Sequence, residues 1–273
     1  MKSFRDREIL ITGAGSGIGR ATALAFAAEG ASLWLADLDE QGNAETAEQA
    51  RRAGARARTF HCDVADEQSV RALAEAVHER IDALDILMNN AGIGSAGRFL
   101  DTSLETWRRV MDVNLMGVVH GCHAFLPAMV EQGRGGHVIN VASAAGYFAA
   151  PDMPVYAASK FAVQGFSEAL RADMASHGIG VSTICPGIIN TGIVANSIME
   201  GRMGDPERHG KIVDFYRKRN FTAEDVAKSV LRAVRGNRAV QPVSAEAWGL
   251  YYAKRFAPRL LQKVSEKEPP FLK

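Results

Sequence analysis

Near the N-terminus the chain reads Thr12-Gly13-Ala14-Gly15-Ser16-Gly17-Ile18-Gly19. An apolar run of strand length (8–12) precedes this stretch, and an alanine-rich segment of helical length (20–29) follows it. A cluster of glycines alone predicts only a tight turn. Between a buried strand and a helix, however, glycines let the backbone approach a pyrophosphate, whose charge is favoured by the free N–H groups of the helix N-terminus. We therefore interpret 12–19 as a phosphate-binding turn.

The same alternation of apolar strand and helical segment recurs along the chain, which predicts a parallel sheet covered by helices. Thr222 and Asp225 have the spacing of a capping box, which marks the start of a helix that should end before Gly236. We expect a single α/β domain with a doubly wound sheet of about seven strands and helices on both faces. The expected strands are 8–12, 31–36, 57–62, 84–88, 137–141, 180–185 and 239–243, and the expected helices are 20–29, 40–53, 67–80, two within 103–132, 156–176 and 222–235.

A long insertion at 190–220 interrupts the alternation. Connections of this length inside a compact domain are usually functional, so we expect a lid over a substrate pocket within a domain that spans 1–247. Its basic residues Arg202, Arg208 and Lys211 leave room for an anionic group on the substrate. The pocket is expected to be apolar, because the insertion carries Ile193, Val194, Ile198, Met199, Met203, Phe215 and Tyr216.

The remaining residues, 248–273, form a C-terminal tail that mixes aromatic with basic side chains. Such a composition is compatible with a membrane surface, but Pro258 interrupts the pattern and the apolar positions make no clean stripe. We expect the tail to pack against the domain or against a second subunit, without membrane contact.

Composition excludes several other classes of protein. With 32 basic and 31 acidic side chains among 273 residues, the net charge of +1 removes the electrostatic reason to propose nucleic-acid binding. No run approaches the roughly 20 apolar residues of a membrane span, and residues 1–8 lack the apolar core of a secretory signal. The three cysteines and seven histidines show no metal-ligand spacing. We expect a cytoplasmic protein without a metal site.

Asp37 follows the second strand, about 20 residues after the glycine turn. At this position a carboxylate can accept hydrogen bonds from both ribose hydroxyls of an adenosine, and it would repel a 2′-phosphate. Leu38, Ala14 and Ser16 offer no cation to compensate. The sequence therefore favours NAD over NADP, although an Asp that only caps the next helix remains an alternative.

Tyr156 and Lys160 are four residues apart in a predicted helix, so both side chains lie on one face of it. Ser143 follows a predicted strand that should deliver it to the same edge of the sheet. A tyrosine has an ordinary pKa near 10, and we expect the nearby ammonium to lower it toward the range useful for acid–base catalysis. On their own, a Tyr and a Lys at this spacing more often form an exposed helix face.

Together these features resemble the short-chain dehydrogenase/reductase family over about 5–245. The resemblance implies a Rossmann-type domain, and it rests on several motifs in the expected order. They are Thr12 to Gly19, Asp63-Val64, Asn89-Asn90-Ala91-Gly92, Asn114 within Asp112-Val113-Asn114-Leu115, Ser143, the Tyr156/Lys160 pair, and Pro186-Gly187 followed by Thr191.

The resemblance also implies a role for each matching residue. Tyr156 would be the general acid/base and Ser143 would hydrogen-bond the substrate oxygen. Lys160 would hold the nicotinamide ribose and lower the pKa of Tyr156, and Asn114 would hold a water of a proton relay. The residues expected to bind the cofactor are Gly13, Ser16, Gly17, Ile18, Gly19, Asp37, Asp63, Val64, Asn90, Ala91, Gly92, Tyr156, Lys160, Pro186, Gly187, Ile189 and Thr191.

The expected activity is hydride transfer between NAD(H) and a secondary alcohol or ketone, with a lipophilic small molecule as the substrate. One alternative is an NADPH-dependent 3-oxoacyl-thioester (acyl-carrier-protein) reductase, which the carboxylate of Asp37 disfavours. A second is a non-catalytic dinucleotide sensor, which would not need the Tyr156/Lys160 pair. The resemblance also implies a homodimer or homotetramer, assembled through the long helices at about 103–132 and 156–176.

Overall fold

The computed structural model describes residues 1–219 and 221–266. Asn220 of the predicted insertion and 267–273 of the predicted tail lie outside the described residues. A seven-stranded parallel sheet runs in the order β3-β2-β1-β4-β6-β7-β9. Its strands are β1 (Glu8–Thr12), β2 (Ser32–Asp37), β3 (Ala57–His61), β4 (Ile86–Asn89), β6 (Gly136–Val141), β7 (Ile179–Pro186) and β9 (Val240–Val243). The predicted sheet is confirmed.

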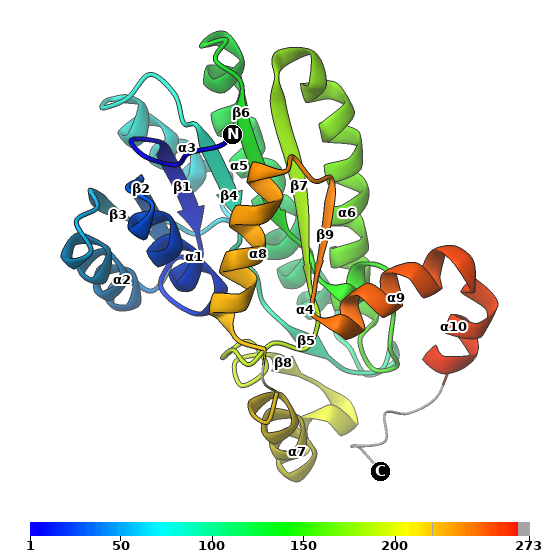
Figure 1. Ribbon diagram of the computed structural model, residues 1–273. Coiled ribbons are helices and arrows are strands. Elements are labelled where there is room, and N and C mark those ends of the chain that lie inside the picture. The colour runs from blue at the N-terminus through cyan, green and yellow to red at the C-terminus, as the bar shows by residue number, and fades with distance from the viewer. Residues whose placement is uncertain (220, 267–273) are drawn as a thin grey trace.

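Helices cover both faces of this sheet (Figure 1). One layer holds α1 (Gly17–Ala28), α2 (Glu40–Arg52) and α8 (Ala223–Arg235), and the other holds α3 (Glu67–His78), α5 (Gly117–Glu131) and α6 (Pro154–Met174). Two clusters of buried apolar side chains fill the space between each layer and the sheet. The predicted capping box is present at the start of α8, where Thr222 and Asp225 cap one another.

The segment expected to form two helices is one continuous helix. It runs through α4 (Leu104–Met111), a π-helical turn η1 (Asp112–Met116) and α5, so the predicted break is wrong. Within the described part of the chain, Leu104–Glu131 is the one helix long and apolar enough to cross a membrane by length and composition, and half of its most apolar window is buried in the domain. Its contacts with α3 and β4 explain why it is apolar.

The insertion has structure of its own at the carboxyl edge of the sheet (Figure 1). It contains β8 (Ile198–Met199), a 3-10 turn η4 (Gly201–Gly204) and α7 (Pro206–Arg217). The short strand β5 (Ser95–Ala96) pairs with β8 in parallel. The apolar side chains of the insertion form a small separate cluster around Val194, Met203 and Ile212.

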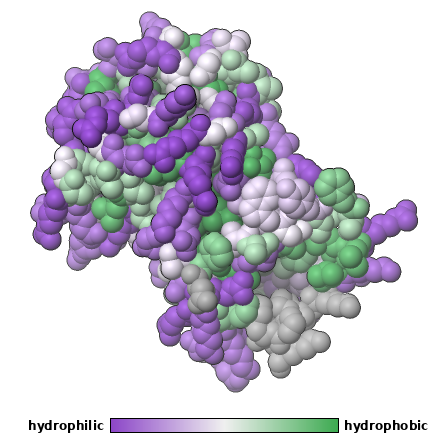
Figure 2. All heavy atoms as spheres, in the orientation of Figure 1, coloured by the Kyte–Doolittle hydropathy of each residue, from purple (hydrophilic) through white to green (hydrophobic). Residues whose placement is uncertain are grey.

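The predicted tail forms two helices, α9 (Ala245–Phe256) and α10 (Pro258–Ser265). The predicted boundary between 247 and 248 falls inside α9. Apolar and aromatic side chains gather over these helices at the right of Figure 2, where Tyr252, Phe256 and Leu260 are exposed. Two further short 3-10 turns are η2 (Ala144–Gly146) and η3 (Ala175–His177). Tyr147, directly after η2, ties α9 to the domain by donating a hydrogen bond to the carbonyl of Ala247 at 3.0 Å.

His137 on β6 makes the free energy of unfolding depend on pH. Its Nε2 lies 2.8 Å from the Ser182 hydroxyl, and burial lowers the pKa of His137 to about 3. The ordinary pKa is near 6.5, so below that pH the unfolded chain binds a proton that the folded chain does not. The stability that depends on a neutral, buried His137 is therefore fully present at neutral pH, and it is lost as the pH falls from about 6.5 toward 3.

We expect His137→Gln to remove this acid sensitivity, because the glutamine amide can still donate to Ser182 but does not titrate. Between about pH 7 and pH 5, urea unfolding of the unaltered chain should lose about 2 kcal/mol more than that of the variant. The exposed His123 provides the matched control, His123→Gln, which should behave like the unaltered chain. Equal losses for His137→Gln and the unaltered chain would contradict the assignment.

Candidate active site

A pocket of about 1030 Å³ opens at the carboxyl edge of the sheet, where the strand order reverses between β1 and β4. Ligands of open α/β sheets bind at such a reversal. All predicted site residues line this pocket except Gly19 and Asn114. Those two contact residues that do line it, Gly19 beside Gly13 and Asn114 beside Ile93. The structure thus brings the predicted set together around one cavity.

The glycine turn crosses from β1 to α1 and has no room for a side chain at Gly13. Gly13 has a φ of +65°, and a Cβ there would lie 2.8 Å from the Cα of Ala91. The amide Nδ2 of Asn90 donates to the carbonyls of Thr12 at 2.9 Å and Gly13 at 3.0 Å, which fixes the turn. Ser16 at the N-cap of α1 makes no side-chain hydrogen bond to the helix. The first N–H groups of α1 are therefore available to bind an anion.

Asp37 lies beside this turn at the end of β2. Its Oδ2 accepts from the N–H of Gly15 at 2.7 Å, and its Oδ1 accepts from the N–H of Asp39 at 2.9 Å. The capping alternative fails, because Asp39 and not Asp37 accepts from the first turn of α2, at Gly42. The carboxylate of Asp37 therefore faces the pocket, within reach of a ribose on the glycine turn.

Arg20 is the cation that sequence reasoning missed near Asp37. Its guanidinium lies under the glycine turn and donates to the carbonyl of Gly15 at 2.5 Å and the hydroxyl of Thr46 at 3.0 Å. It also pairs with Glu45 at 3.1 Å. These contacts hold Arg20 in the scaffold and do not place it in the pocket lining. The described pocket lining contains the cations Arg109 and Lys160, and neither forms an ion pair with Asp37; Arg109 lies 3.7 Å from Asp63.

Asp63 and Val64, the residues expected to contact adenine, also line the pocket. Asp63 Oδ1 accepts from the N–H of Ala65 at 3.0 Å. The carbonyl of Val64 lies 2.9 Å from Nδ1 of His120 on α5. Arg109 of α4 also lines the pocket, with its Nη1 3.7 Å from Asp63 Oδ2. Sequence reasoning missed Arg109, because nothing in the pattern of α4 tells which side of the helix faces the cavity.

Ser143, Tyr156 and Lys160 meet on the opposite side of the pocket. Ser143 follows β6; its hydroxyl accepts from the N–H of Ala145 at 3.1 Å, donates to the carbonyl of Pro186 at 3.5 Å, and lies near enough to Tyr156 to favour its phenolate. Tyr156 lies in the first turn of α6, which Pro154 opens. Lys160 Nζ donates to the carbonyl of Val141 at 3.1 Å and lies 5.8 Å from the centre of the Tyr156 ring.

The ionisation of this group differs from the prediction. Burial raises the pKa of Tyr156, and the hydrogen bond from Ser143 only partly opposes the rise. The net lowering expected for this pKa is therefore not found, because burial disfavours the phenolate more than Ser143 favours it. Burial also lowers the pKa of Lys160 to about 8. Tyr156 is a neutral phenol at neutral pH and can donate a proton.

Asn114 occupies the π-helical turn η1. Its amide donates to the carbonyl of Ile93 at 3.0 Å and to the hydroxyl of Ser159 at 3.1 Å, and its Oδ1 accepts from the N–H of Ile93 at 2.8 Å. π-helical turns inside α-helices often mark functional sites, because the extra residue redirects side chains. Here the turn directs Asn114 at the loop that lies next to Lys160.

The wide part of the pocket is apolar and is enclosed from two sides. The insertion contributes all of the apolar residues predicted from it except Ile198. The tail helices contribute residues that sequence reasoning missed, because their apolar positions have no clean period and no sequence signal shows which way they fold. They are Gly249, Leu250, Ala253, Leu260, Leu261 and Val264.

The predicted role of the insertion's basic residues in binding an anionic group finds no support. None of Arg202, Arg208 and Lys211 lines the pocket. Arg202 is paired with Asp152, and Lys211 is paired with Glu207 at 2.8 Å. No cluster of His, Cys, Asp and Glu that could hold a metal occurs within residues 1–219 and 221–266.

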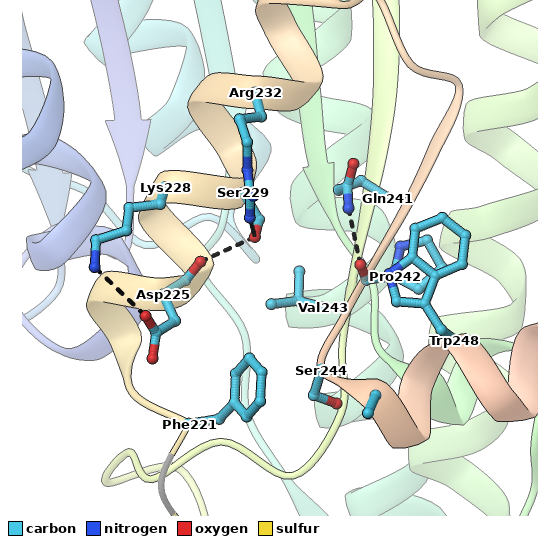
Figure 3. Close-up of a pocket in the computed structure, with 11 residues that line it drawn as sticks. Phe221, Asp225, Lys228, Ser229, Arg232, Gln241, Pro242, Val243, Ser244 and Trp248 are labelled. Atoms are coloured by element: carbon cyan, nitrogen blue, oxygen red, sulfur yellow. Dashed lines mark hydrogen bonds and ion pairs between the residues drawn. The ribbon is translucent and has the colours of Figure 1, made fainter.

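A second, smaller cavity of about 270 Å³ lies between α8 and the start of α9 (Figure 3). Its polar side chains pair mainly with one another: Arg232 donates to Ser229 at 2.9 Å, and Lys228 lies 3.5 Å from Asp225. It contains none of the predicted site residues.

Comparison with known proteins points in the same direction as the geometry. The family model described as short chain dehydrogenase matches residues 7–200. The probable oxidoreductase EphD of Mycobacterium tuberculosis is 43% identical over 266 residues, which are 96% of this chain but 45% of EphD. Estradiol 17-beta-dehydrogenase 11 of the mouse is 37% identical over 198 residues, covering 71% of this chain and 66% of that protein.

Among solved structures, a short chain dehydrogenase/reductase from Burkholderia phymatum in complex with NAD has a TM-score of 0.88 and 32% identity. The match covers 99% of both chains. The chain therefore spans somewhat less than half of EphD, whereas it matches the NAD-bound structure along its whole length.

Proposed function

This chain belongs to the short-chain dehydrogenase/reductase family, and from that premise we propose that it is an oxidoreductase that transfers a hydride between NAD(H) and a lipophilic secondary alcohol or ketone. The observation that carries the proposal is the arrangement of one pocket. Ser143, Tyr156 and Lys160 meet at one end of it, and Asp37 faces the glycine turn at the other.

The residues present fit a nicotinamide dinucleotide. The glycine turn leaves open space at Gly17, where a Cβ would lie no nearer than 3.8 Å to its neighbour Thr191, and the uncapped N-terminus of α1 offers N–H groups to a pyrophosphate. Asp37 would hold the adenosine ribose, and Asp63 and Val64 would border the adenine. Lys160 would hold the second ribose, and Pro186, Gly187, Ile189 and Thr191 would border the nicotinamide. When bound, the nicotinamide ring accepts or donates the hydride.

The chain's own residues handle the proton. In reduction, the neutral phenol of Tyr156 donates its proton to the substrate oxygen while the carbonyl carbon receives the hydride; in oxidation, a Tyr156 phenolate takes the proton of the alcohol. Ser143, which lines the same cavity as Tyr156, would orient that oxygen. Asn114 would hold a water that links Lys160 to solvent, so that the proton of Tyr156 can be exchanged.

The preference for a lipophilic substrate is supported by the apolar walls beside Tyr156. Met199, Met203 and Ile212 of the insertion and Leu250 and Leu261 of the tail helices line this part of the cavity. Apolar pockets with a few fixed polar groups bind apolar ligands in a defined orientation. One relative named above is an estradiol dehydrogenase, and by its printed name acts on an apolar alcohol.

The preference for NAD over NADP is supported by the carboxylate of Asp37, which no cation in the pocket lining beside it offsets within the described residues. An NADPH-dependent 3-oxoacyl-thioester reductase is the second candidate, and it would require the 2′-phosphate to lie against this carboxylate. A non-catalytic sensor is disfavoured by the contact between Ser143 and Tyr156, which a sensor would not need.

We propose a homodimer or homotetramer assembled through α4, α5 and α6. Exposed apolar side chains on this continuous surface support the proposal: Leu104 is 71% exposed, Met116 38% and Phe161 36%. Sedimentation equilibrium tests it, and a monomer at micromolar concentration would contradict it.

The activity is tested by following NADH formation from NAD with a panel of secondary alcohols at alkaline pH. The panel should include sterols, long-chain alcohols and small polar sugars. We expect turnover with a higher kcat/KM for the lipophilic alcohols. Sugars that are equal to or better than lipophilic alcohols would contradict the apolar pocket, and turnover of 3-oxoacyl thioesters with NADPH alone would favour the reductase.

A further inference from the structure

Asp152 is a buried carboxylate that the proposed mechanism does not use. It lies between η2 and α6, its side chain is 2% exposed, and its φ is +62°. Its Oδ1 accepts from Arg202 Nε at 3.1 Å and its Oδ2 pairs with Arg202 Nη2. Arg98 Nε lies 3.5 Å from the same carboxylate. Two arginines thus converge on one buried aspartate.

These contacts join three segments that are far apart in the sequence. Asp152 precedes Tyr156 by four residues, Arg202 belongs to η4 of the insertion, and Arg98 follows β5. The backbone repeats the link, because the N–H of Gly97 donates to the carbonyl of Asp152 at 2.8 Å. A left-handed backbone at a residue other than glycine is kept only where the surroundings require it.

The part of the insertion next to Arg202 forms one wall of the substrate pocket. Met203 directly follows Arg202 and packs with Ile212 and Tyr216, and all three line the cavity. Tyr216 lies near enough to Tyr156 that a charge on Tyr156 raises the pKa of Tyr216, although burial is the larger cause of the rise to about 12. This wall and the acid/base residue therefore line the same cavity.

Charged groups taken out of water need strong pairing to offset the loss of hydration, so a buried ion pair is a poor device for stability alone. It is a good device for fixing one geometry, because a bidentate Arg–carboxylate contact is directional. The contact between Asp152 and Arg202 joins the loop that leads into α6, whose first turn carries Tyr156, to the insertion that forms a wall of the same cavity.

We propose that Asp152 is a positioning residue, which holds the insertion through Arg202 so that the apolar wall stays opposite Tyr156 and selects bulky apolar substituents on the substrate. The expected effect on substrate kinetics rests on the proposed function. The expected effect on the position of the insertion does not. Only the part of a substrate that reaches the insertion should sense the contact. A small alcohol that contacts only Ser143 and Tyr156 should not.

The principal variant is Asp152→Asn, because asparagine has the same shape and tolerates a left-handed backbone. Misplacing a wall of a site by about 1 Å can cost about 100-fold. We expect KM for a long alcohol such as decan-2-ol to rise at least about 10-fold, with kcat within about 3-fold, and KM for butan-2-ol to stay within about 2-fold. The dissociation constant of NADH should not change.

Arg202→Met provides a second variant that spares the left-handed residue, and it should reproduce the same split in KM. The matched control is Glu207→Gln, which removes an exposed carboxylate of the insertion from its pair with Lys211 and should leave both alcohols unaffected. A uniform loss of kcat for both alcohols, or no change in either variant, would overturn the proposal.

Amide hydrogen exchange tests the structural half without any substrate. In Asp152→Asn and Arg202→Met we expect exchange of the amides within 194–204 to accelerate at least about 10-fold relative to the control, while those of β1 and β4 stay unchanged. If no alcohol is turned over by the unaltered chain, the proposed function fails and this exchange result still decides on the positioning role. Unchanged exchange at 194–204 would contradict it.

Discussion

Tyr156→Phe should lower kcat for the preferred secondary alcohol by about 1000-fold, because it removes the one hydroxyl placed to exchange a proton with the substrate oxygen. Tyr156 lines one cavity with Ser143, and its ring is 5.8 Å from Lys160 Nζ. Neither neighbour can replace it: the Ser143 hydroxyl has too high a pKa to transfer a proton efficiently, and Lys160 is engaged with the carbonyl of Val141. Steady-state and single-turnover measurements of NADH formation would check the loss.

The matched control for this variant is Tyr252→Phe, which removes a hydroxyl from an exposed tyrosine of α9 outside the pocket lining. It should keep kcat within about 3-fold. Binding of NADH should be nearly equal in both variants and in the unaltered chain, since the phenol is assigned to the substrate oxygen. A Tyr156→Phe variant with kcat above about a tenth of the original would remove Tyr156 from the acid/base role.

Asp37→Ala should change the cofactor preference by about 100-fold. The carboxylate is expected to accept hydrogen bonds from the ribose, and such bonds to a charged group are worth about 1.5–3 kcal/mol. The same substitution relieves the repulsion of a 2′-phosphate. NADH binding should therefore weaken and NADPH binding should tighten, as measured by the ratio of the two dissociation constants.

Two further variants separate the charge of Asp37 from its structural contacts. Asp37→Asn can keep the acceptor for the N–H of Gly15, and it should shift the ratio in the same direction but by less. Asp39→Asn removes a neighbouring carboxylate that caps α2 and does not line the pocket, and should leave the ratio unchanged. An unchanged ratio in Asp37→Ala would show that the carboxylate serves the glycine turn and not the choice of cofactor.

The sheet could be predicted from the sequence because its strands are buried on both faces. Such strands appear as continuous apolar runs, and β2 was expected at 31–36 and lies at Ser32–Asp37. The π-helical turn could not be predicted in this way. The extra residue of the π-helical turn within Asp112–Met116 displaces the apolar positions of the helix by less than these positions vary in an ordinary helix. The sequence therefore predicts two helices where the structure has one.

The candidate site was predicted where chemistry lies in contiguous motifs, and missed where it depends on distant contacts. The spacing of Tyr156 and Lys160 placed both on one helix face, but spacing says nothing of burial, and burial decides the direction of the Tyr156 pKa. Asp152 and Arg202 are 50 residues apart. Nothing in the sequence around Arg202 distinguishes a partner for Asp152 from a residue that would bind a substrate anion.

Isothermal titration calorimetry of the unaltered chain with NADH, and separately with NADPH, tests most directly the claim that this pocket is an NAD(H) site. It needs no knowledge of the substrate. The account predicts saturable binding of NADH with a Kd at least about 10-fold lower than that of NADPH, a difference of about 1.4 kcal/mol. Tighter binding of NADPH, or binding of neither dinucleotide, would contradict it.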